Sequence, residues 1–176
     1  YWISVRPGIS DTAIFLGISK YLMDNKLYDE TFVKQFTDLP LLVRTDTLKR
    51  LRAAEVFPSY KLGLSKDGPS FAIQGLQQSQ YEKLGDFVVQ DKKSGRLQPI
   101  TRDEVGSHLA DKGIDPDLEW KGTVRLLDGS QVEVMSLWEM YKVHLRDYDL
   151  QTVSEICGAP KELIERLAKD IATIKP

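Results

Sequence analysis

The residues best suited to chemistry stand near the start of the chain, where Arg6-Pro7-Gly8 is followed by Ser10 and Asp11. Pro7 and Gly8 end an extended segment and allow a tight turn, and Ser10 or Asp11 can cap the helix that follows. The N-terminus of such a helix offers unpaired N–H groups and a partial positive charge to a ligand. In open α/β sheets, nucleotides bind at this kind of edge. Two interpretations follow: Asp11 helps to bind a ligand, or Ser10 and Asp11 only cap the helix.

The elements on either side of this turn must position it. Residues 2–6 alternate between two faces, with Ile3 and Val5 on one of them, which is typical of a short strand. From about residue 12 to residue 25, apolar residues at helical spacing form a single stripe. Gly17 lies inside this predicted helix at a cost in helix propensity, which a close approach of the helix to a strand would explain.

Bulk composition excludes several classes of function. The chain has 176 residues, a net charge of −2 and an ordinary hydrophobic fraction of 41%, so it predicts one domain or one and a half. This charge gives no reason to expect nucleic acid or an anionic membrane as a partner. His108 and His144 lie on separate predicted helices without metal-ligand spacing, and Cys157, the one cysteine, is best explained as a small buried residue.

The middle of the chain predicts two β-hairpins. Residues 87–90 and 96–100 flank a turn-rich connection, and residues 123–127 and 130–134 flank Asp128-Gly129, a strong hairpin signal. A helix capped by Asp29 is expected to turn Phe32, Val33 and Phe36 inward. Two further predictions are a linker over residues 62–76 and a capping box at residues 101–104 that starts a short helix.

Other helices are predicted from their caps. Ser136 is expected to start one helix, and Asp149 another that ends at Gly158 in the left-handed conformation. Pro160 suits the start of the last helix. A basic helix from about residue 46 to Ala54 carries Lys49, Arg50 and Arg52, which either reach phosphates or acidic partners or form a solvated face.

Both ends of the chain resemble the molybdopterin oxidoreductases, the dimethyl sulfoxide reductase family. The family's Arg-Pro-Gly-Thr-Asp-Ala-Ala-Leu segment is similar to residues 6–16, although here two residues rather than one separate Gly8 from Asp11. Residues 28–30, 32–33, 36–44 and 153–176 continue the match. The resemblance is greatest to nitrate reductases, nitrite oxidoreductases and perchlorate reductases.

This resemblance implies an internal fragment of a molybdenum-dependent catalytic subunit that transfers an oxygen atom on an oxyanion such as nitrate or nitrite. The implied cofactor is molybdopterin guanine dinucleotide, whose guanine the matching Asp11 would recognise. Gly8 after Pro7 would let the backbone approach, Ser10 could donate a hydrogen bond, and Arg6 could contact phosphate or, at least as readily, pair with an acid. No residue can be assigned as the molybdenum ligand, so the isolated chain is expected to be inactive and to contain no cofactor.

The implied partners are the rest of the catalytic subunit and an iron–sulfur electron-transfer subunit. The resemblance suggests a membrane-associated or periplasmic parent enzyme, while this chain predicts no direct membrane insertion and no nucleic-acid binding.

The predicted fold class is α/β: part of a nucleotide-binding α/β layer with an inserted region rich in β-hairpins. Residues 1–44 would form the cofactor-binding segment, residues 45–134 the insertion with two hairpins, and residues 135–176 a helical return to the layer. The alternative is a module for subunit interaction without a cofactor role. On that alternative the hairpins and the basic helix bind a partner subunit, and Asp11 is a cap.

Overall fold

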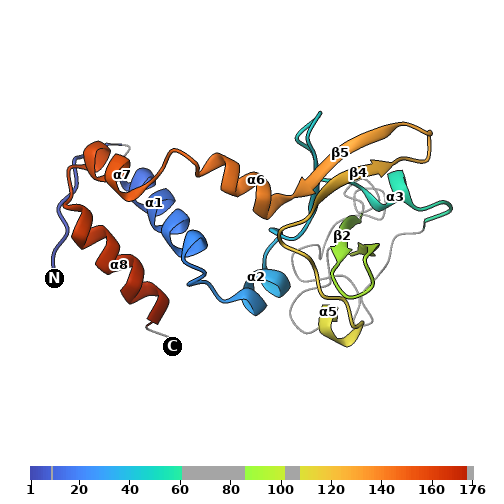
Figure 1. Cartoon of the computed structure of the whole chain (residues 1–176), viewed down its shortest axis with the longest axis horizontal. Helices are drawn as coiled ribbons and strands as arrows, with labels where there is room; N and C mark the ends of the chain where they lie inside the picture. Colours follow the sequence, from blue (N-terminus) through green and yellow to red (C-terminus); the bar gives the residue numbers. More distant parts are fainter. Residues whose placement is uncertain (9, 61–85, 102–107, 174–176) are drawn as a thin grey trace, which may run out of the picture. The chain divides into compact units, whose positions relative to one another are not determined.

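The computed structural model describes residues 1–8, 10–60, 86–101 and 108–173 (Figure 1). It combines helices with small antiparallel sheets, which confirms the predicted α/β class. The chain divides into two compact units: unit 1 comprises Tyr1–Asp29 with Tyr141–Pro176, and unit 2 comprises Glu30–Met140. None of the helices in the described ranges has the length and apolar composition that a membrane crossing requires.

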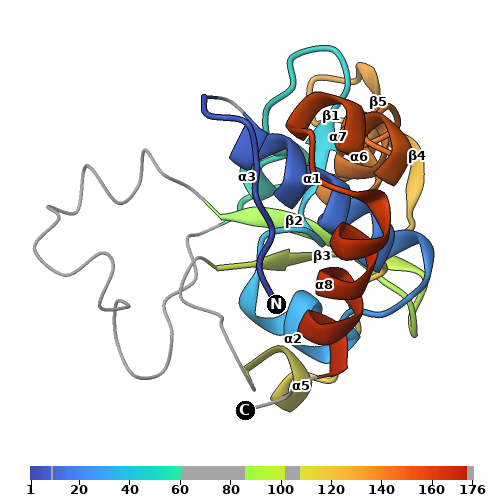
Figure 2. The ribbon, with the colours of Figure 1, turned by 90° about the vertical axis from the view of Figure 1, so that its left-hand side faces the viewer.

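The described part of unit 1 has three complete helices: α1 (Ser10–Asp24), α7 (Leu150–Cys157) and α8 (Lys161–Thr173). Figure 1 and Figure 2 show the three side by side, and α1 contacts both of the others. Their apolar stripes enclose a core that includes the fully buried Val153, Cys157 and Ile164. The predicted stripe of the first helix is thus confirmed, with Ile14 and Ile18 buried in this core.

Gly17 allows a close approach, but its neighbour is a helix and not the predicted strand. A Cβ atom at Gly17 would lie 2.7 Å from Cγ2 of Val153 on α7. At Gly17, α1 therefore packs against another helix, α7, and not against a strand as the sequence suggested.

The predicted strand over residues 2–6 is wrong: the described residues 1–8 contain no strand. The predicted alternation is nonetheless present, because Ile3 and Val5 pack against the helical core while Trp2 is 84% exposed. The amide of Arg6 donates to the carbonyl of Cys157 at 2.8 Å, so the segment pairs with the end of a helix. An alternating sequence predicts an extended segment with one buried face and does not specify what covers that face.

Unit 2 contains the two predicted hairpins. β2 (Phe87–Asp91) pairs antiparallel with β3 (Arg96–Ile100), and β4 (Lys121–Arg125) pairs with β5 (Gln131–Ser136). β1 (Leu42–Arg44) adds to β5, which gives the order β1-β5-β4. Within the residues of unit 2 that the structure describes, the helices are α2 (Glu30–Phe36), α3 (Ala53–Val56), α5 (His108–Asp111) and α6 (Leu137–His144), the last of which contributes to both units.

Two predictions in unit 2 are wrong. The basic helix is a turn followed by an isolated bridge, and only α3 is helical. Arg50 forms an ion pair with Asp38 and lies over the ring of Phe87, 5.4 Å from its centroid, so it is bound within the unit. On α2 only Val33 is buried, whereas Phe32 and Phe36 are 55% exposed and stack on each other at 5.4 Å.

The predicted helix caps at Ser136, Asp149 and Gly158 are confirmed. The Ser136 hydroxyl accepts the amide of Glu139 at 3.1 Å, and the Asp149 carboxylate accepts the amides of Gln151 and Thr152. Gly158 ends α7 with a φ of 75°, as predicted. The predicted linker over residues 62–76 and most of the predicted capping box at residues 101–104 lie outside the described residues.

Candidate functional site

Of the stretch from Arg6 to Asp11 the structure describes residues 6–8, 10 and 11, and Arg6 is bound to the end of α7. The guanidinium of Arg6 donates to the carbonyl of Glu155 at 3.0 Å, two residues before the carbonyl that accepts the Arg6 amide. The C-terminal carbonyls of a helix lack partners within the helix and carry partial negative charge, so a cation suits this position. Of the two alternatives for Arg6, contact with a phosphate stays a prediction, and no acid in the described part of the chain pairs with Arg6 beside this contact with backbone oxygen.

Ser10 is the first residue of α1 and is 3% exposed. Its hydroxyl donates to the carbonyl of Arg6 and so closes the turn from within. That proton is therefore already used, although the hydroxyl oxygen can still accept a hydrogen bond. Gly8 has a φ of 110°, a conformation that favours glycine, and apart from its chain neighbours no described residue has an atom within 4 Å of the place of a Cβ.

Asp11 is exposed in the first turn of α1. Among the described residues its carboxylate has no hydrogen-bond or ion-pair partner, so it is not folded back onto the amides of its own helix. The interpretation of Asp11 as a helix cap finds no support in these contacts. A carboxylate that is open to solvent beside the partial positive charge of a helix start can accept two hydrogen bonds from a ligand.

Unit 1 also has a polar hollow of about 340 Å³ at the other end of α7. Among its lining residues are Lys20, Asp24, Asp149, Lys161 and Glu165, and none of the residues of the Arg6–Asp11 turn. Asp24 is paired with Lys20 at 2.9 Å, and Asp149 is occupied by the cap of α7. Because three carboxylates face two lysines, this hollow does not favour a phosphate.

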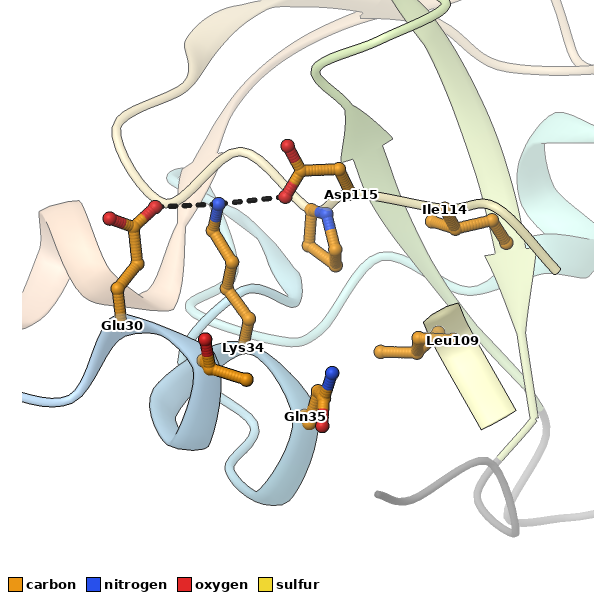
Figure 3. A pocket seen from close by; sticks show the side chains of 8 residues that line it. Glu30, Lys34, Gln35, Leu109, Ile114 and Asp115 are labelled. Atoms are coloured by element: carbon orange, nitrogen blue, oxygen red, sulfur yellow. Dashed lines mark hydrogen bonds and ion pairs between the residues drawn. The ribbon is translucent and has the colours of Figure 1, made fainter. Parts of the chain in front are cut away.

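A hollow of about 200 Å³ in unit 2 lies between α2, α5 and the loop around Asp115 (Figure 3). Lys34 points between two acids, with its Nζ atom 2.6 Å from Glu30 and 2.7 Å from Asp115. Burial lowers the pKa of Lys34, but the hydrogen bonds to Asp115 and Glu30 outweigh this and leave the pKa raised. These charges satisfy one another, so the triad fastens α2 to the loop rather than offering a vacant charge to a ligand.

Sequence reasoning missed Asp91, which is buried at the end of β2. Its carboxylate accepts the hydroxyl of Ser94 at 2.6 Å and the amide of Asp115 at 2.9 Å, along with the amides of Lys93 and Ser94. The Ser94 hydroxyl is the main cause of a pKa lowered to about 2, which the amides reinforce against the effect of burial. The spacing of Asp91 and Ser94 signals a turn, but nothing local in the sequence indicates Asp115.

Metal-binding residues do not gather anywhere in the described ranges: no group of three or more His, Cys, Asp or Glu residues could hold an ion. His144 is exposed, with its ring stacked on that of Tyr141 and tilted against that of Tyr148, at 6.4 and 6.0 Å between ring centroids. Cys157 is fully buried, and its sulfur accepts the amide of Ala159 at 3.4 Å. The predicted structural role of Cys157 agrees with these contacts.

Comparison with known proteins gives a consistent group of relatives. The chain is 32% identical to the perchlorate reductase subunit alpha of Dechloromonas aromatica (99% of this chain, 19% of that protein) and 32% identical to the respiratory nitrate reductase subunit alpha of Haloferax mediterranei (97% and 16%). It is 26% identical to a dopamine dehydroxylase of Eggerthella lenta (98% and 22%). The chain thus spans about a fifth of the length of these curated relatives. No family model matches it.

Proposed function

Because this chain belongs to the molybdopterin oxidoreductase family, we propose that its Arg6–Asp11 turn helps to bind the guanosine end of a molybdopterin guanine dinucleotide. The chain then acts as one segment of a molybdenum-dependent catalytic subunit. Its own share of the chemistry is to hold and orient the cofactor.

The observation that carries this proposal is the exposed carboxylate of Asp11 at the start of α1, which has no partner within the described ranges. The Watson–Crick edge of guanine presents two adjacent donors, the ring N1–H and the exocyclic amine. A carboxylate accepts both in one planar, bidentate contact, and adenine lacks this pair of donors. The polar groups of the turn therefore fit a guanine base.

The neighbours of Asp11 shape the turn around the proposed ligand. Gly8 leaves its backbone uncovered, so that a base or ribose can approach closely. Pro7 fixes its own φ angle and so restricts the backbone immediately before Gly8. Ser10 holds the carbonyl of Arg6, and Arg6 keeps guanidinium N–H groups beyond the one bound to Glu155, which can face a phosphate.

The parent enzyme is proposed to transfer an oxygen atom on an oxyanion such as nitrate or nitrite, a reaction whose redox chemistry the bound molybdenum supplies. Two relatives are named for perchlorate and nitrate, while another is named for dopamine. Substrate choice therefore differs among relatives that align with nearly the whole of this chain. We assign the substrate and the molybdenum ligand to other parts of the parent subunit, and electron transfer to or from the molybdenum, according to the direction of the reaction, to a separate iron–sulfur subunit.

The test is titration of the chain with GDP, a soluble mimic of the guanosine end, followed by NMR or calorimetry. The wild type is expected to bind GDP weakly and to prefer it to ADP, and Asp11→Asn to lose about tenfold or more in affinity, because an amide presents a donor to a donor. Glu162→Gln, which changes an exposed acid in the first turn of α8, is the matched control and should bind as the wild type does. Equal affinity of Asp11→Asn and wild type for GDP would refute the proposal.

A subunit-interaction module without a cofactor role remains the second candidate. The exposed stack of Phe32 and Phe36 on α2 favours it, because adjoining exposed aromatic rings are typical of protein interfaces. Absence of GDP binding, together with tight binding of a partner subunit that is lost in Phe32→Ser, would support this candidate instead.

A further inference from the structure

A single residue, Arg6, joins the last turn of α7 to the first residue of α1. Its amide donates to Cys157, its guanidinium donates to Glu155, and its carbonyl accepts the hydroxyl of Ser10. The main-chain and side-chain contacts of Arg6 thus reach both helices. The start of α1, which carries Asp11, is held in place relative to the end of α7.

The far end of the same segment is also held. The Tyr1 hydroxyl donates to Asp170 on α8 at 2.7 Å, and the guanidinium of Arg166 lies 4.3 Å from the centroid of the Tyr1 ring. Residues 1–6 are therefore fastened to two helices, although no β partner in the described part of the chain holds them. These contacts fix the position at which the following turn begins.

Gly158 has two reasons to be glycine. It ends α7 with a φ of 75°, and a Cβ atom there would lie 3.0 Å from Nε and 3.3 Å from Cγ of Arg6. Gly95 and Gly129 also have positive φ, but nothing lies within 4 Å of a Cβ at either. The lack of a side chain at Gly158 leaves the space in which the side chain of Arg6 lies.

We infer that Arg6 and Gly158 form a positioning pair that aims the Asp11 carboxylate at the guanine edge. This inference rests on the proposed guanine-binding function and gives Arg6 a role distinct from binding phosphate. A bidentate contact requires the carboxylate plane to meet the base plane, and the direction of an exposed side chain follows the placement of its helix start. Gly158 belongs to the site through this effect, without touching the ligand.

The first arm of the test measures amide hydrogen exchange in the intact chain without ligand. In Arg6→Ala, exchange is expected to accelerate at the amide of the substituted residue and at Ile14, the first amide of α1 with a bond inside the helix, while the amides of α8 stay unchanged. Arg6→Lys should restore part of the protection, because an ammonium group can also donate to Glu155. Unchanged exchange at the start of α1 in Arg6→Ala would overturn the inference.

The second arm uses matched glycines. Asparagine tolerates the left-handed conformation, so Gly158→Asn and Gly95→Asn carry a similar backbone cost, but only the first places a Cβ against Arg6. Gly158→Asn is expected to weaken GDP binding about three- to tenfold and Gly95→Asn to leave it unchanged. Equal affinities in the two variants would contradict a role for Gly158 in positioning.

The third arm separates positioning from general stability. Ile164→Val removes a methyl group from the fully buried core of unit 1 without touching the turn. If this variant and Arg6→Ala lose equal stability and equal affinity for guanosine, which lacks the phosphates that Arg6 could contact, Arg6 is only structural. If the wild type fails to bind GDP, the guanine proposal fails, and with it the role in aiming Asp11. The exchange measurements then still decide whether Arg6 anchors α1.

Discussion

The two units of the chain differ in whether the charged side chains discussed above have partners inside the protein. In unit 2 the central acids and bases are bound to one another or to backbone amides: Lys34 bridges Glu30 and Asp115, and Asp91 accepts four hydrogen bonds. In unit 1 the helices meet through apolar side chains, and the acid at the start of α1 is left open to solvent. A charged group that is bound by protein groups holds the fold together, whereas a charged group without such a partner can bind a ligand.

The difference also predicts how each unit fails. A buried carboxylate that organises a loop is costly to remove, because several donors lose their partner together. A helical core is most sensitive to changes of volume where the helices approach closely. Substitutions can therefore be chosen that damage one unit and spare the other.

The largest effect is expected from Asp91→Ala in unit 2. The substitution leaves the Ser94 hydroxyl and the amide of Asp115 without their acceptor and should cost about 2–4 kcal/mol of stability. Amide exchange should accelerate across β2, β3 and the loop around Asp115, and remain as in the wild type in α1, α7 and α8.

Asp128→Ala is the control for this prediction. Asp128 makes similar bonds to Ser130, but it does so in an exposed turn and to one residue only. It should change the exchange of the β4–β5 turn alone. A global loss of protection in Asp128→Ala, or none in Asp91→Ala, would remove the basis of the contrast between the units.

How much of this arrangement the sequence predicts depends on how local each signal is. The β4–β5 hairpin follows from Asp128-Gly129, and the caps at Ser136, Asp149 and Gly158 follow from residues within one helical turn. The glycine turn before Asp11 is likewise visible in the sequence, because the residue types alone indicate it, while the role of Asp11 in ligand binding stays a prediction.

Signals that depend on distant partners were missed. The segment of residues 2–6 packs on helices rather than in a sheet, and its partner Cys157 lies about 150 positions away in the sequence. Asp91 depends on Asp115, and Gly158 depends on Arg6. In each case the local pattern is compatible with several partners, and only the tertiary fold selects one.

A smaller effect should follow from lowering the pH. Asp91 has a pKa of about 2 in the folded state, below the ordinary value of 3.8. A depressed pKa stabilises the fold at pH values above the ordinary pKa, and this contribution is lost as the pH falls from about 4 towards 2. Unit 2 is therefore expected to lose protection against amide exchange over this interval.

Asp149 gives unit 1 a weaker acid dependence, because the Thr152 hydroxyl and the first amides of α7 also lower its pKa. In Asp91→Ala the steep part of the acid dependence of unit 2 should disappear, since the titrating group is gone. Persistence of the same slope in this variant would assign the effect to other carboxylates, such as Asp46, whose pKa its bonds to Arg44 lower to about 2.

The smallest effect, and the one specific to unit 1, is expected from Gly17→Ala. In an open helix this change stabilises by up to about 1 kcal/mol, because alanine has the higher helix propensity. Here the new Cβ would lie 2.7 Å from Cγ2 of Val153, a stiff and fully buried side chain that cannot move aside. The net result should be a loss of about 1–2 kcal/mol, measured by denaturant unfolding or as faster exchange confined to α1 and α7.

A double-mutant cycle isolates the cause of this loss. Val153→Ala removes both Cγ atoms and leaves only the Cβ of residue 153, 3.2 Å from the added methyl group, so Gly17→Ala should destabilise clearly less in that background. If Gly17→Ala destabilises equally with valine or alanine at position 153, the close contact between α1 and α7 is not its cause. A smaller loss of stability from Gly17→Ala with alanine at position 153 would show that the stability of unit 1 depends on the fit between α1 and α7.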